Sequence, residues 1–460
     1  MKRVVVIGGG ISGLAAAWTT QRAARLHGAD VEVVVLEREA EVGGKARTIS
    51  RDGWVLEAGP SGFLSGRPGM ERLVDAAGLR DDVVRARPAA NRRFVHRGGT
   101  TREIVQHPVG FLRSRLLTAR GRLRMLAEPL VPRHRGGEES VWAFSARRLG
   151  REFADGLIDP MMLGIFAGNA RDLSLDAAFP LMRGLEREHR SLILAMIARR
   201  GRPGRELNSF RGGMQRLPRA LAERGGFQVR CNAVVRAIAR ANEGWRVWLD
   251  GGGDPLHADA LVLAGEPWAM AELLAPHDDA LGGELRAIRC PPVSVVALGY
   301  APPAAARVPL GFGVLLARGE GFRMLGNLWE THLYPERGPE GHVLVKATFG
   351  GSVDAAAGAL DESALLSLAR AEVERLYGIA DDPVFAHVVR WPHAIPQYEM
   401  GHLDRVARIE RAVAALPNAW ITGFGLRGVA FADAASDGIR TGEAVARLVG
   451  SALTAGAEYT

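Results

Sequence analysis

Cysteine is almost absent from this chain. Among 460 residues only Cys231 and Cys290 occur, which excludes a disulfide-dense scaffold and any metal site built on a cysteine cluster. So few cysteines are typical of a reducing, intracellular compartment, and one disulfide between the two is the alternative. We therefore expect a cytoplasmic protein without a metal ion.

Long apolar runs are also missing. No stretch of about 18 apolar residues occurs, so the sequence predicts no helix that spans a membrane. The first residues, Met1–Arg3, lead directly into an apolar, strand-like run. This arrangement leaves no room for a secretory signal ahead of folded structure.

Lysine is scarce, whereas arginine is abundant. Of the 59 basic residues only Lys2, Lys45 and Lys346 are lysine, and much of the net charge of +8 reflects this arginine bias. A basic balance can also attract anions, such as a polycarboxylate substrate or a membrane surface. We exclude nucleic acid as a partner because the sequence has no basic stripe with interleaved aromatics and no nucleic-acid motif.

What is present is a dinucleotide-binding pattern near the N-terminus. A buried-strand run over 4–7 leads into a G-x-G-x-x-G turn, a helix over 14–26 and a second strand over 31–36. The glycines let the backbone approach a pyrophosphate, the helix N-terminus offers free N–H groups, and an acid after the second strand can bind the adenosine ribose. The expected cofactor contacts are Gly8, Gly10, Ser12, Gly13 and Glu37.

A second glycine pair distinguishes between cofactors. Gly43 and Gly44 are followed by Lys45 and Arg47, where an ordinary NAD domain would continue with helix and strand. A glycine doublet before basic residues predicts a second backbone approach to a diphosphate, with Lys45 or Arg47 as charge partner. An exposed turn is the alternative. The arrangement resembles the glutathione-reductase-like FAD domain in its amine-oxidase branch, which implies FAD, held non-covalently.

The FAD domain is predicted to be discontinuous. A strand that ends at Gly423 precedes a helix over 434–449, so helix N–H groups can face the cofactor at a second place. Val234, at the start of a strand in the middle piece, and Gly423 are therefore expected near the cofactor. The strands expected in that middle piece are 227–230, 234–238, 245–249 and 259–264.

The fold class is α/β, or α+β for the chain as a whole, with a discontinuous Rossmann-like FAD domain. Two further units are a substrate domain with a mixed sheet and a helical insertion. The sheet is expected to use strands over 293–298 and 342–349 and a helix over 362–376. The expected boundaries are 1–65, 206–284 and 401–460 for the FAD domain, 66–99 and 285–400 for the substrate domain, and 100–205 for the helical insertion.

One segment of the helical insertion is basic and amphipathic. Residues 111–135 carry seven arginines and one acid, Glu128, interleaved with apolar side chains. Such a helix can lie in an anionic membrane interface, which would place the protein peripherally on the inner face of the cell membrane. The alternative is an ordinary helix packed on its own domain with solvated arginines.

Three further stretches identify a closer resemblance. They are 164–169 (GIFAGN), 210–214 (FRGGM) and 391–402, which contains I-P-Q-Y-x-x-G-H and is the most specific of the three. Together with the N-terminal unit they resemble the protoporphyrinogen oxidase family and its coproporphyrinogen-oxidising relatives. We interpret Tyr398 and His402 of the last stretch as structural residues and assign neither to catalysis.

The resemblance implies a substrate site. Arg93 matches the family arginine that pairs with a substrate propionate, and a guanidinium suits a carboxylate because its planar fork binds both oxygens. Leu315 and Leu328 would sandwich a tetrapyrrole, Phe349 would stack on it, and Gly168 would leave room beside it. The alternatives are a surface arginine and ordinary core residues.

The resemblance also implies an activity. In the family, three successive hydride transfers to flavin convert protoporphyrinogen IX to protoporphyrin IX in haem biosynthesis, and dioxygen reoxidises the flavin. No catalytic residue is assigned beyond the flavin, because the sequence shows no triad, paired-carboxylate or metal signature. Partners are then the tetrapyrrole and dioxygen; a homodimer and a peripheral membrane contact are left open.

This chain departs from the family near its C-terminus. The segment before the last helix contains Val429, an expected flavin contact, but Ala432 and Ala434 replace the usual Asn and Cys. Glu266 also replaces an apolar residue after an earlier strand. The alternatives are therefore coproporphyrinogen III as substrate, another FAD amine oxidase or desaturase of a secondary pathway, and a non-catalytic flavin protein at a membrane.

Overall fold

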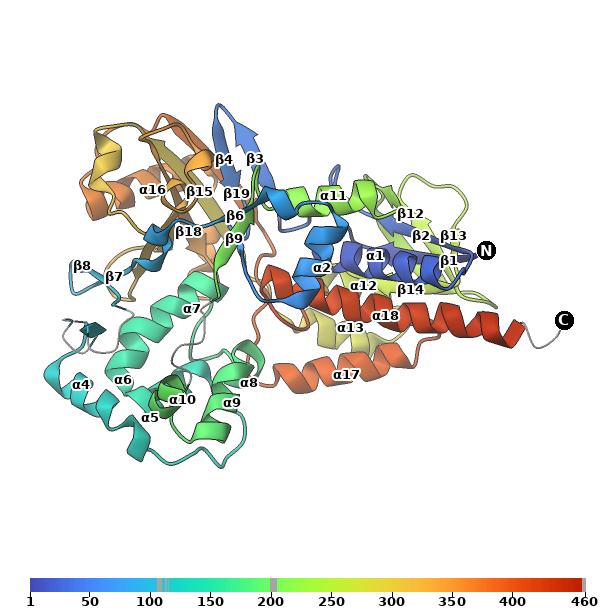
Figure 1. The fold of residues 1–460 in the computed structure, drawn as a ribbon, viewed down its shortest axis with the longest axis horizontal. Coiled ribbons are helices and arrows are strands. Elements are labelled where there is room, and N and C mark those ends of the chain that lie inside the picture. Colours follow the sequence, from blue (N-terminus) through green and yellow to red (C-terminus); the bar gives the residue numbers. More distant parts are fainter. Residues whose placement is uncertain (106–109, 112–113, 115, 199–204, 457–460) are drawn as a thin grey trace.

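The computed structural model describes residues 1–460 except 106–109, 112–113, 115, 199–204 and 457–460. Figure 1 shows three parts: an α/β unit on the right, a large sheet at upper left and a group of helices at lower left. Both ends of the described chain lie in the α/β unit. This arrangement confirms the expected fold class.

The α/β unit is built on a parallel five-stranded sheet. Strand β1 alternates, with Val4 and Val6 in one hydrophobic cluster and Val5 and Ile7 in the cluster on the other face, because successive side chains point to opposite faces. Both faces are covered, which explains why these strands are apolar throughout. In spatial order the strands are β10 (Gln228–Arg230), β2 (Val31–Leu36), β1 (Lys2–Ile7), β14 (Ala260–Leu263) and β20 (Ala419–Ile421).

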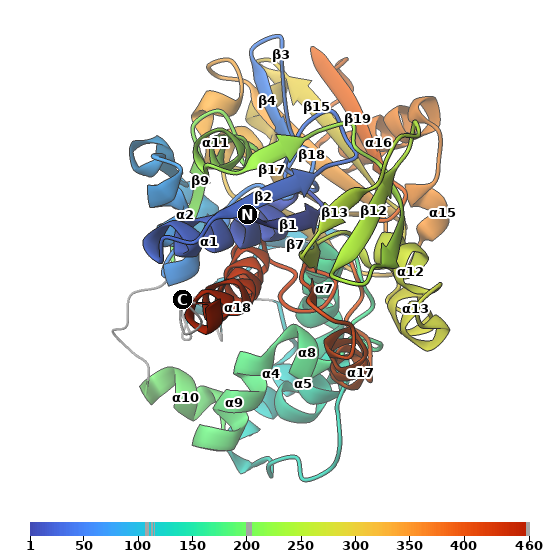
Figure 2. The ribbon, with the colours of Figure 1, turned by 90° about the vertical axis from the view of Figure 1, so that its right-hand side faces the viewer.

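Helices cover one face of this sheet, and a small antiparallel sheet with three further helices covers the other (Figures 1 and 2). The first group is α1 (Ile11–Leu26), α2 (Pro68–Ala76), α11 (Arg216–Arg224) and α18 (Phe431–Gly456). The second group is β11 (Val235–Arg240), β12 (Trp245–Leu249), β13 (Leu256–Ala258), α12 (Pro267–Leu274), α13 (Asp279–Arg286) and α17 (His402–Ala414). The unit is thus assembled from separated pieces of chain, as predicted.

Two sequence-based expectations for this unit were wrong. Residues 66–99 were assigned to the substrate domain, and 93–97 do lie in its sheet, yet Met70, Leu73 and Val74 of α2 are buried in the core of the α/β unit. An amphipathic helix does not reveal which core its apolar face will join. Likewise, α18 extends beyond both ends of the predicted helix 434–449, from Phe431 to Gly456.

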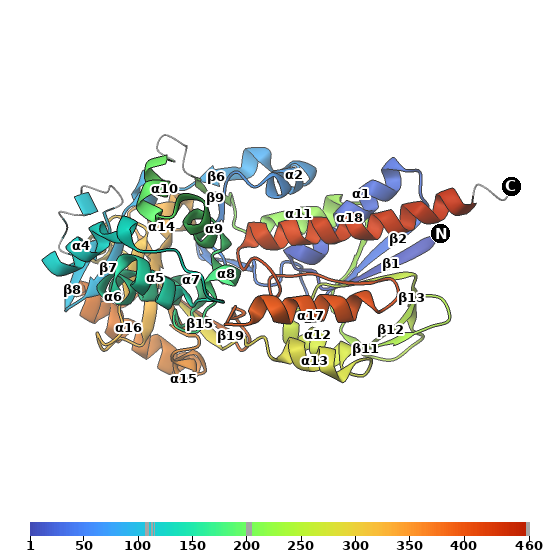
Figure 3. The same cartoon turned by 90° about the horizontal axis from the view of Figure 1, so that it is seen from below.

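The long helix α18 lies against α1 (Figures 1 and 3). A Cβ atom on Gly438 would lie 2.1 Å from the carbonyl oxygen of Ser12, and one on Gly442 would lie 2.6 Å from that of Ala16. These two glycines, four residues apart on α18, therefore let the two helix backbones touch. The Ser12 hydroxyl uses this closeness and donates to the Ala434 carbonyl at 3.0 Å.

The second part is a seven-stranded mixed sheet. Helix α16 (Glu362–Tyr377) covers one face, and the ribbon β3 (Thr48–Arg51)–β4 (Trp54–Glu57) and helix α7 (Asp159–Phe166) pack on the other. The sequence had assigned residues 100–103 to the helical insertion. They belong to this sheet instead, because β7 and β8 pair as a hairpin. In order the strands are β19 (Phe385–Trp391), β15 (Val293–Tyr300), β18 (Val343–Gly350), β17 (Met324–Trp329), β16 (Gly313–Leu316), β7 (Arg93–Arg97) and β8 (Thr100–Glu103).

The third part is helical. A π-helical turn, Ala154–Ile158, precedes α7, and such turns are common near functional sites. The helices are α4 (Ala119–Leu126), α5 (Val141–Leu149), α6 (Arg151–Phe153), α7, α8 (Leu175–Ala178), α9 (Pro180–His189) and α10 (Leu192–Ala198). Of the predicted basic segment, Arg113 and Arg115 lie outside the described residues. Within the part of the chain that is described, no helix combines the length and apolar character needed to cross a bilayer.

Shorter elements join these parts. A three-stranded sheet of β5 (Phe63–Leu64), β9 (Leu207–Phe210) and β6 (Val83–Arg85) lies where the chain passes between units. The remaining short helices and 3₁₀ turns are 80–82, 88–91, 128–130, 304–307, 335–337, α14 (Glu330–Leu333) and α15 (Ala355–Gly358).

Candidate functional site

The first glycine loop is shaped by contacts that a side chain would prevent. A Cβ atom on Gly13 would lie 2.0 Å from the Gly8 carbonyl oxygen, so α1 packs directly on the loop. A Cβ atom on Gly10 would meet nothing within 4 Å, so the loop is open on that side. Gly10 caps α1 without a side-chain hydrogen bond. The N-terminus of α1 can therefore receive an anion such as a diphosphate.

Glu37 lies beside this loop at the end of β2. One carboxylate oxygen accepts the Gly9 N–H at 2.7 Å and the other accepts the Glu39 N–H at 2.9 Å. Burial raises the pKa of Glu37, and the two backbone N–H groups oppose that rise. The Ala233 N–H donates to the Glu37 carbonyl at 2.8 Å, which brings the exposed side chain of Val234 to the same edge. A ribose and its base could be bound here.

The second glycine pair lies on the first loop. The Gly43 N–H donates to the Gly9 carbonyl at 2.9 Å, and Gly10 and Gly43 form a parallel bridge. A Cβ atom on Gly44 would be 3.4 Å from the Cα atom of Gly10. Gly43 and Gly44 have φ angles of 128° and 56°, which favour glycine. The structure thus brings together the two loops that the sequence predicted to face one diphosphate.

Lys45 and Arg47 differ in their surroundings. The ammonium of Lys45 lies 2.6 Å from a carboxylate oxygen of Glu266 and 4.4 Å from the centre of the Trp391 ring. Its charge is therefore already balanced within the protein. Arg47 is exposed and makes no ion pair with any described residue. Of the two predicted charge partners, Arg47 is therefore the one available to an external anion.

A third segment reaches the same place from the C-terminal piece. Gly423 follows β20 with a φ angle of 135°, and a Cβ atom there would lie 3.7 Å from the Gly265 carbonyl oxygen. The residue before Gly265 has a carbonyl oxygen 2.7 Å from the Cβ position of Gly8. The end of β14 thus lies between the first loop and the Gly423 turn. Val429, farther along, is partly buried against the cluster that contains Phe166 and Tyr398.

Sequence reasoning missed Asp437, and it noted Glu266 without its pairing partner. Asp437 of α18 accepts the Thr422 hydroxyl at 2.6 Å and the Gly423 N–H at 3.2 Å, so it fixes the start of the turn. Glu266 pairs with Lys45. An acid early in the helix that follows a glycine turn was a usable signal for Asp437, whereas the pairing of Glu266 depends on tertiary structure.

The predicted substrate residues lie partly on one face of the seven-stranded sheet. Arg93, Gly313, Leu328 and Lys346 are neighbours across four strands, and directly paired residues share a face. The guanidinium of Arg93 lies 5.0 Å from the centre of the Phe312 ring and makes no ion pair with a described residue. Arg93 is therefore available for an external carboxylate.

Leu315 is on the same face, one pleat along, because it pairs with Val95 and Gly326. Helix α7 approaches it so closely that a Cβ atom on Gly164 would lie 2.6 Å from a methyl carbon of Leu315. Leu315 and Leu328 are both partly exposed. The structure therefore brings these leucines and Arg93 to one surface.

Phe349 and Gly168 are placed differently from the prediction. Phe349 shares the opposite face of β18 with Val345 and Ala347, is 0% exposed and lies in the cluster under α16. It has no free surface on which a ring could stack, and this prediction was wrong. Gly168 is buried, and a Cβ atom there would lie 2.4 Å from the side-chain oxygen of Gln397. Its lack of a side chain is thus explained within the protein.

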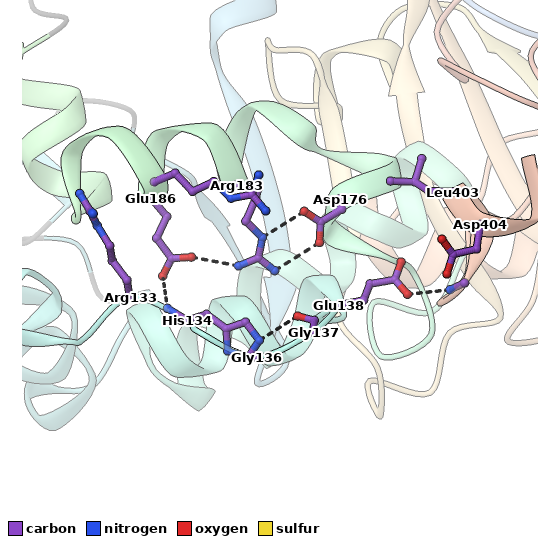
Figure 4. A pocket seen from close by; sticks show the side chains of 12 residues that line it. Arg133, His134, Gly136, Gly137, Glu138, Asp176, Arg183, Glu186, Leu403 and Asp404 are labelled. Atoms are coloured by element: carbon purple, nitrogen blue, oxygen red, sulfur yellow. Dashed lines mark hydrogen bonds and ion pairs between the residues drawn. The ribbon is translucent and has the colours of Figure 1, made fainter. Parts of the chain in front are cut away.

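A pocket of about 420 Å³ lies away from these residues, between the helical insertion and the start of α17 (Figure 4). Figure 4 shows Arg183 between Asp176 and Glu186, with contacts of 3.1 and 3.0 Å. None of the predicted site residues lines it. Among the described residues, no group of His, Cys, Asp or Glu is arranged to hold a metal ion.

The geometry agrees with comparison to known proteins. A family model described as flavin containing amine oxidoreductase matches residues 11–448. The chain belongs to this amine oxidoreductase family. It is therefore a flavoprotein oxidoreductase, and its cofactor is FAD. The two glycine loops, Glu37 and the Gly423 turn fit that cofactor, because they supply backbone N–H groups and a ribose acceptor around one opening.

Individual relatives of this amine oxidoreductase are similar over most of their length. Coproporphyrinogen III oxidase of Bacillus subtilis (strain 168) is 28% identical, with 95% of this chain and 96% of the relative covered. The chloroplastic protoporphyrinogen oxidase of Oryza sativa subsp. japonica is 32% identical, with coverage of 92% and 83%. A crystal structure from Exiguobacterium sp. 255-15 has a TM-score of 0.86 at 24% identity, covering 97% of this chain and 99% of that one, which shows the shared fold.

Proposed function

We propose that this amine oxidoreductase oxidises protoporphyrinogen IX to protoporphyrin IX, with dioxygen as electron acceptor. The observation that carries the proposal is the counter-ion-free Arg93 beside the partly exposed Leu328 and Leu315, on the sheet face approached by α7. An apolar surface with an arginine at its edge suits a flat, largely apolar ring that bears propionates. The similarity to porphyrinogen oxidases supports the same substrate class.

The protein itself needs only to bind and orient the substrate, because the cofactor carries the redox chemistry. Bound FAD would supply the hydride acceptor: three two-electron oxidations, each removing one hydride from a methylene bridge and releasing one proton, would give the aromatic ring. The protein binds the propionate at Arg93 and holds the ring against the leucines. Tyr398 and His402, the titratable pair of the most specific motif, are both 1% exposed, so neither is placed to exchange a proton with substrate.

Coproporphyrinogen III is the second candidate. The Bacillus subtilis relative named for that substrate matches this chain over 96% of its own length at 28% identity. Coproporphyrinogen carries four propionates against two. A protein built for it would need cations at more than one edge of the ring, whereas Arg93 is the one arginine that the family resemblance assigns to this face.

The test is a direct comparison of the two substrates. The purified yellow protein would be mixed in air with each porphyrinogen, and porphyrin fluorescence and oxygen consumption would be followed together. We expect both to be oxidised, with the higher kcat/KM for protoporphyrinogen IX. A reversed ratio would favour the coproporphyrinogen assignment. Oxidation of neither, by protein that carries FAD, would remove the porphyrinogen proposal and favour another amine oxidase or desaturase.

We further propose that the helical insertion contacts the surface of an anionic membrane. Leu123 and Leu126 of α4 and Leu130 after it are 70%, 51% and 85% exposed, within a segment rich in arginine. Exposed leucines among arginines are typical of interfacial helices. Leu123→Asp with Leu130→Asp should reduce sedimentation with anionic vesicles, whereas Leu310→Asp, at an exposed leucine of the substrate unit, should not. Equal sedimentation of all variants would refute the contact.

A further inference from the structure

The I-P-Q-Y-x-x-G-H segment, 395–402, connects two regions that lie far apart in sequence. On one side it pairs with the helical insertion. The Ser174 N–H donates to the Tyr398 carbonyl at 2.8 Å, and the Met400 N–H donates to the Asp172 carbonyl at 3.0 Å. A β-bridge joins Leu173 to Glu399 between these two bonds. The backbone of the segment is thus fixed to the loop that follows α7.

Gln397 extends this contact to the end of α7. Its amide nitrogen donates to the Phe166 carbonyl at 2.8 Å, and its oxygen lies against Gly168. The side chain is 2% exposed. Residues 166–168 therefore cannot shift relative to the 395–402 segment without breaking a buried hydrogen bond or opening a close contact.

On its other side the segment holds the turn that begins at Gly423. The Tyr398 hydroxyl donates to the Phe424 carbonyl, and the Nε2–H of His402 donates to the Leu426 carbonyl at 2.9 Å. The two rings are stacked, with centres 4.2 Å apart and planes 19° apart. Both donors are almost completely buried and reach the same short turn. They hold the turn from one side while Asp437 of α18 holds it from the other.

The surroundings of His402 favour one protonation state, the neutral ring with its proton on Nε2. Its Nδ1 atom is buried and has no hydrogen-bond partner among the described residues. A proton on that nitrogen would find no acceptor. The ring is therefore a neutral donor through Nε2, which suits a residue that positions a carbonyl and not one that carries protons to a substrate.

We propose that Gln397, Tyr398 and His402 are positioning residues that fix the Gly423 turn relative to residues 166–168 and thereby set how FAD is held. The turn is one of the three segments that face the cofactor, and its carbonyls are oriented by the Tyr398 and His402 donors. The inference rests on FAD as cofactor and is independent of which porphyrinogen is oxidised. It explains why the most specific motif of the sequence contains no catalytic residue.

Tyr398→Phe tests the proposal, with Tyr377→Phe as a matched control. Tyr377 is partly buried against the core of the seven-stranded sheet, and its hydroxyl donates to the Asn327 side chain at 2.7 Å. Tyr398→Phe loses the bond to the Phe424 carbonyl, whereas Tyr377→Phe loses two bonds, because its hydroxyl also accepts the Trp329 indole N–H at 3.0 Å. Tyr398→Phe should raise the Kd for FAD about 3- to 10-fold and shift the visible flavin spectrum and midpoint potential, whereas Tyr377→Phe should change none of these.

His402 offers a second, independent pair of variants. His402→Gln keeps an N–H donor that can reach the Leu426 carbonyl, whereas His402→Leu removes it. We expect the flavin spectrum and FAD affinity to be retained in the glutamine variant and lost in the leucine variant. Wild-type FAD affinity, spectrum and potential in both Tyr398→Phe and His402→Leu would overturn the proposal. The readouts need no porphyrinogen, so they separate this inference from the substrate assignment.

Discussion

The ammonium of Lys346 lies 2.8 Å from a carboxylate oxygen of Glu330, and both side chains are almost completely buried. Arg337 pairs with the same carboxylate and lies 3.3 Å from Glu57. Burial alone would raise the pKa of Glu330, but the two cations together lower it to about 2. Lys346 also donates to the carbonyls of Glu57 and Gly59 at 3.2 Å. The network therefore ties the substrate sheet to the chain that follows the second glycine loop.

Lys346→Met should lower the free energy of unfolding by about 3–5 kcal/mol, because removing one partner leaves buried carboxylates incompletely compensated. Urea denaturation at pH 7 would measure the change. Lys2→Met, at the first residue of β1, is the control, and its free energy of unfolding should stay within about 0.5 kcal/mol of wild type. If Lys346→Met lowered the free energy of unfolding by less than about 1 kcal/mol, Arg337 alone would be enough to compensate the buried carboxylates.

Gly438→Ala should destabilise the protein by about 1–3 kcal/mol, because its Cβ atom would press on the Ser12 backbone and separate α1 from α18. Thermal unfolding of the apoprotein would measure it. Gly283→Ala in α13 is the matched control, since a Cβ atom there meets nothing within 4 Å. That change should stabilise by about 0.4–1 kcal/mol. Equal effects at both sites would contradict the close packing.

Glu37→Ala should weaken FAD binding roughly 10-fold or more, because it removes the carboxylate that the Gly9 and Glu39 N–H groups orient. Titration of apoprotein with FAD, followed by flavin fluorescence, would give the Kd. Glu39→Ala, at an exposed neighbour, should leave the Kd within about 2-fold of wild type. Acid denaturation of the holoprotein should release all the flavin, as expected for non-covalent binding.

Arg93→Ala should raise the KM for porphyrinogen about 10-fold with a smaller effect on kcat, because a lost propionate contact weakens binding more than the hydride step. The KM of Arg93→Lys should lie between those of wild type and Arg93→Ala, since an ammonium cannot bind both carboxylate oxygens. Arg92→Ala is the control. Arg92 pairs with Glu103 at 2.9 Å and neighbours Arg93 in sequence. Unchanged kinetics in Arg93→Ala would remove that residue from the site.

His402 should make the protein sensitive to mild acid. Burial lowers the pKa of His402 to about 4, whereas an unfolded histidine titrates near 6.5. Because the unfolded chain binds the proton first, stability is complete above about pH 6.5 and falls as the pH drops toward 4, by at most about 3 kcal/mol. His402→Gln should reduce this slope when urea unfolding is compared at pH 7.5 and 5. An identical slope would mean that other groups cause the loss.

Many strands, helices and turns could be predicted from the sequence because they depend on local patterns. The alternation at 245–249 and the glycine spacing from Gly8 to Gly13 each determine a local conformation, and both agree with the structure. Phe349 and α2 were misplaced for a different reason. Their apolar character shows that they are buried but not against which partner, and α16 and α18 supply those partners from far along the chain.

Charge pairing was the other part that the sequence could not supply. Lys45 was expected to face a diphosphate, yet Glu266 neutralises it across a separation that no local pattern encodes. The same holds for Tyr398 and His402. Their structural interpretation was reached from the sequence, but the carbonyls that they hold, at Phe424 and Leu426, became visible only in the folded chain.

The contact between α1 and α18 has a consequence for synthesis. Helix α1, whose first turn completes the first glycine loop, packs on α18 from near the end of the described chain, at Gly438 and Gly442. A chain emerging from the ribosome would expose its nucleotide-binding loop long before that support has been made. We therefore expect loading of the coenzyme to follow the synthesis of α18. A nascent chain arrested upstream of that helix would remain colourless.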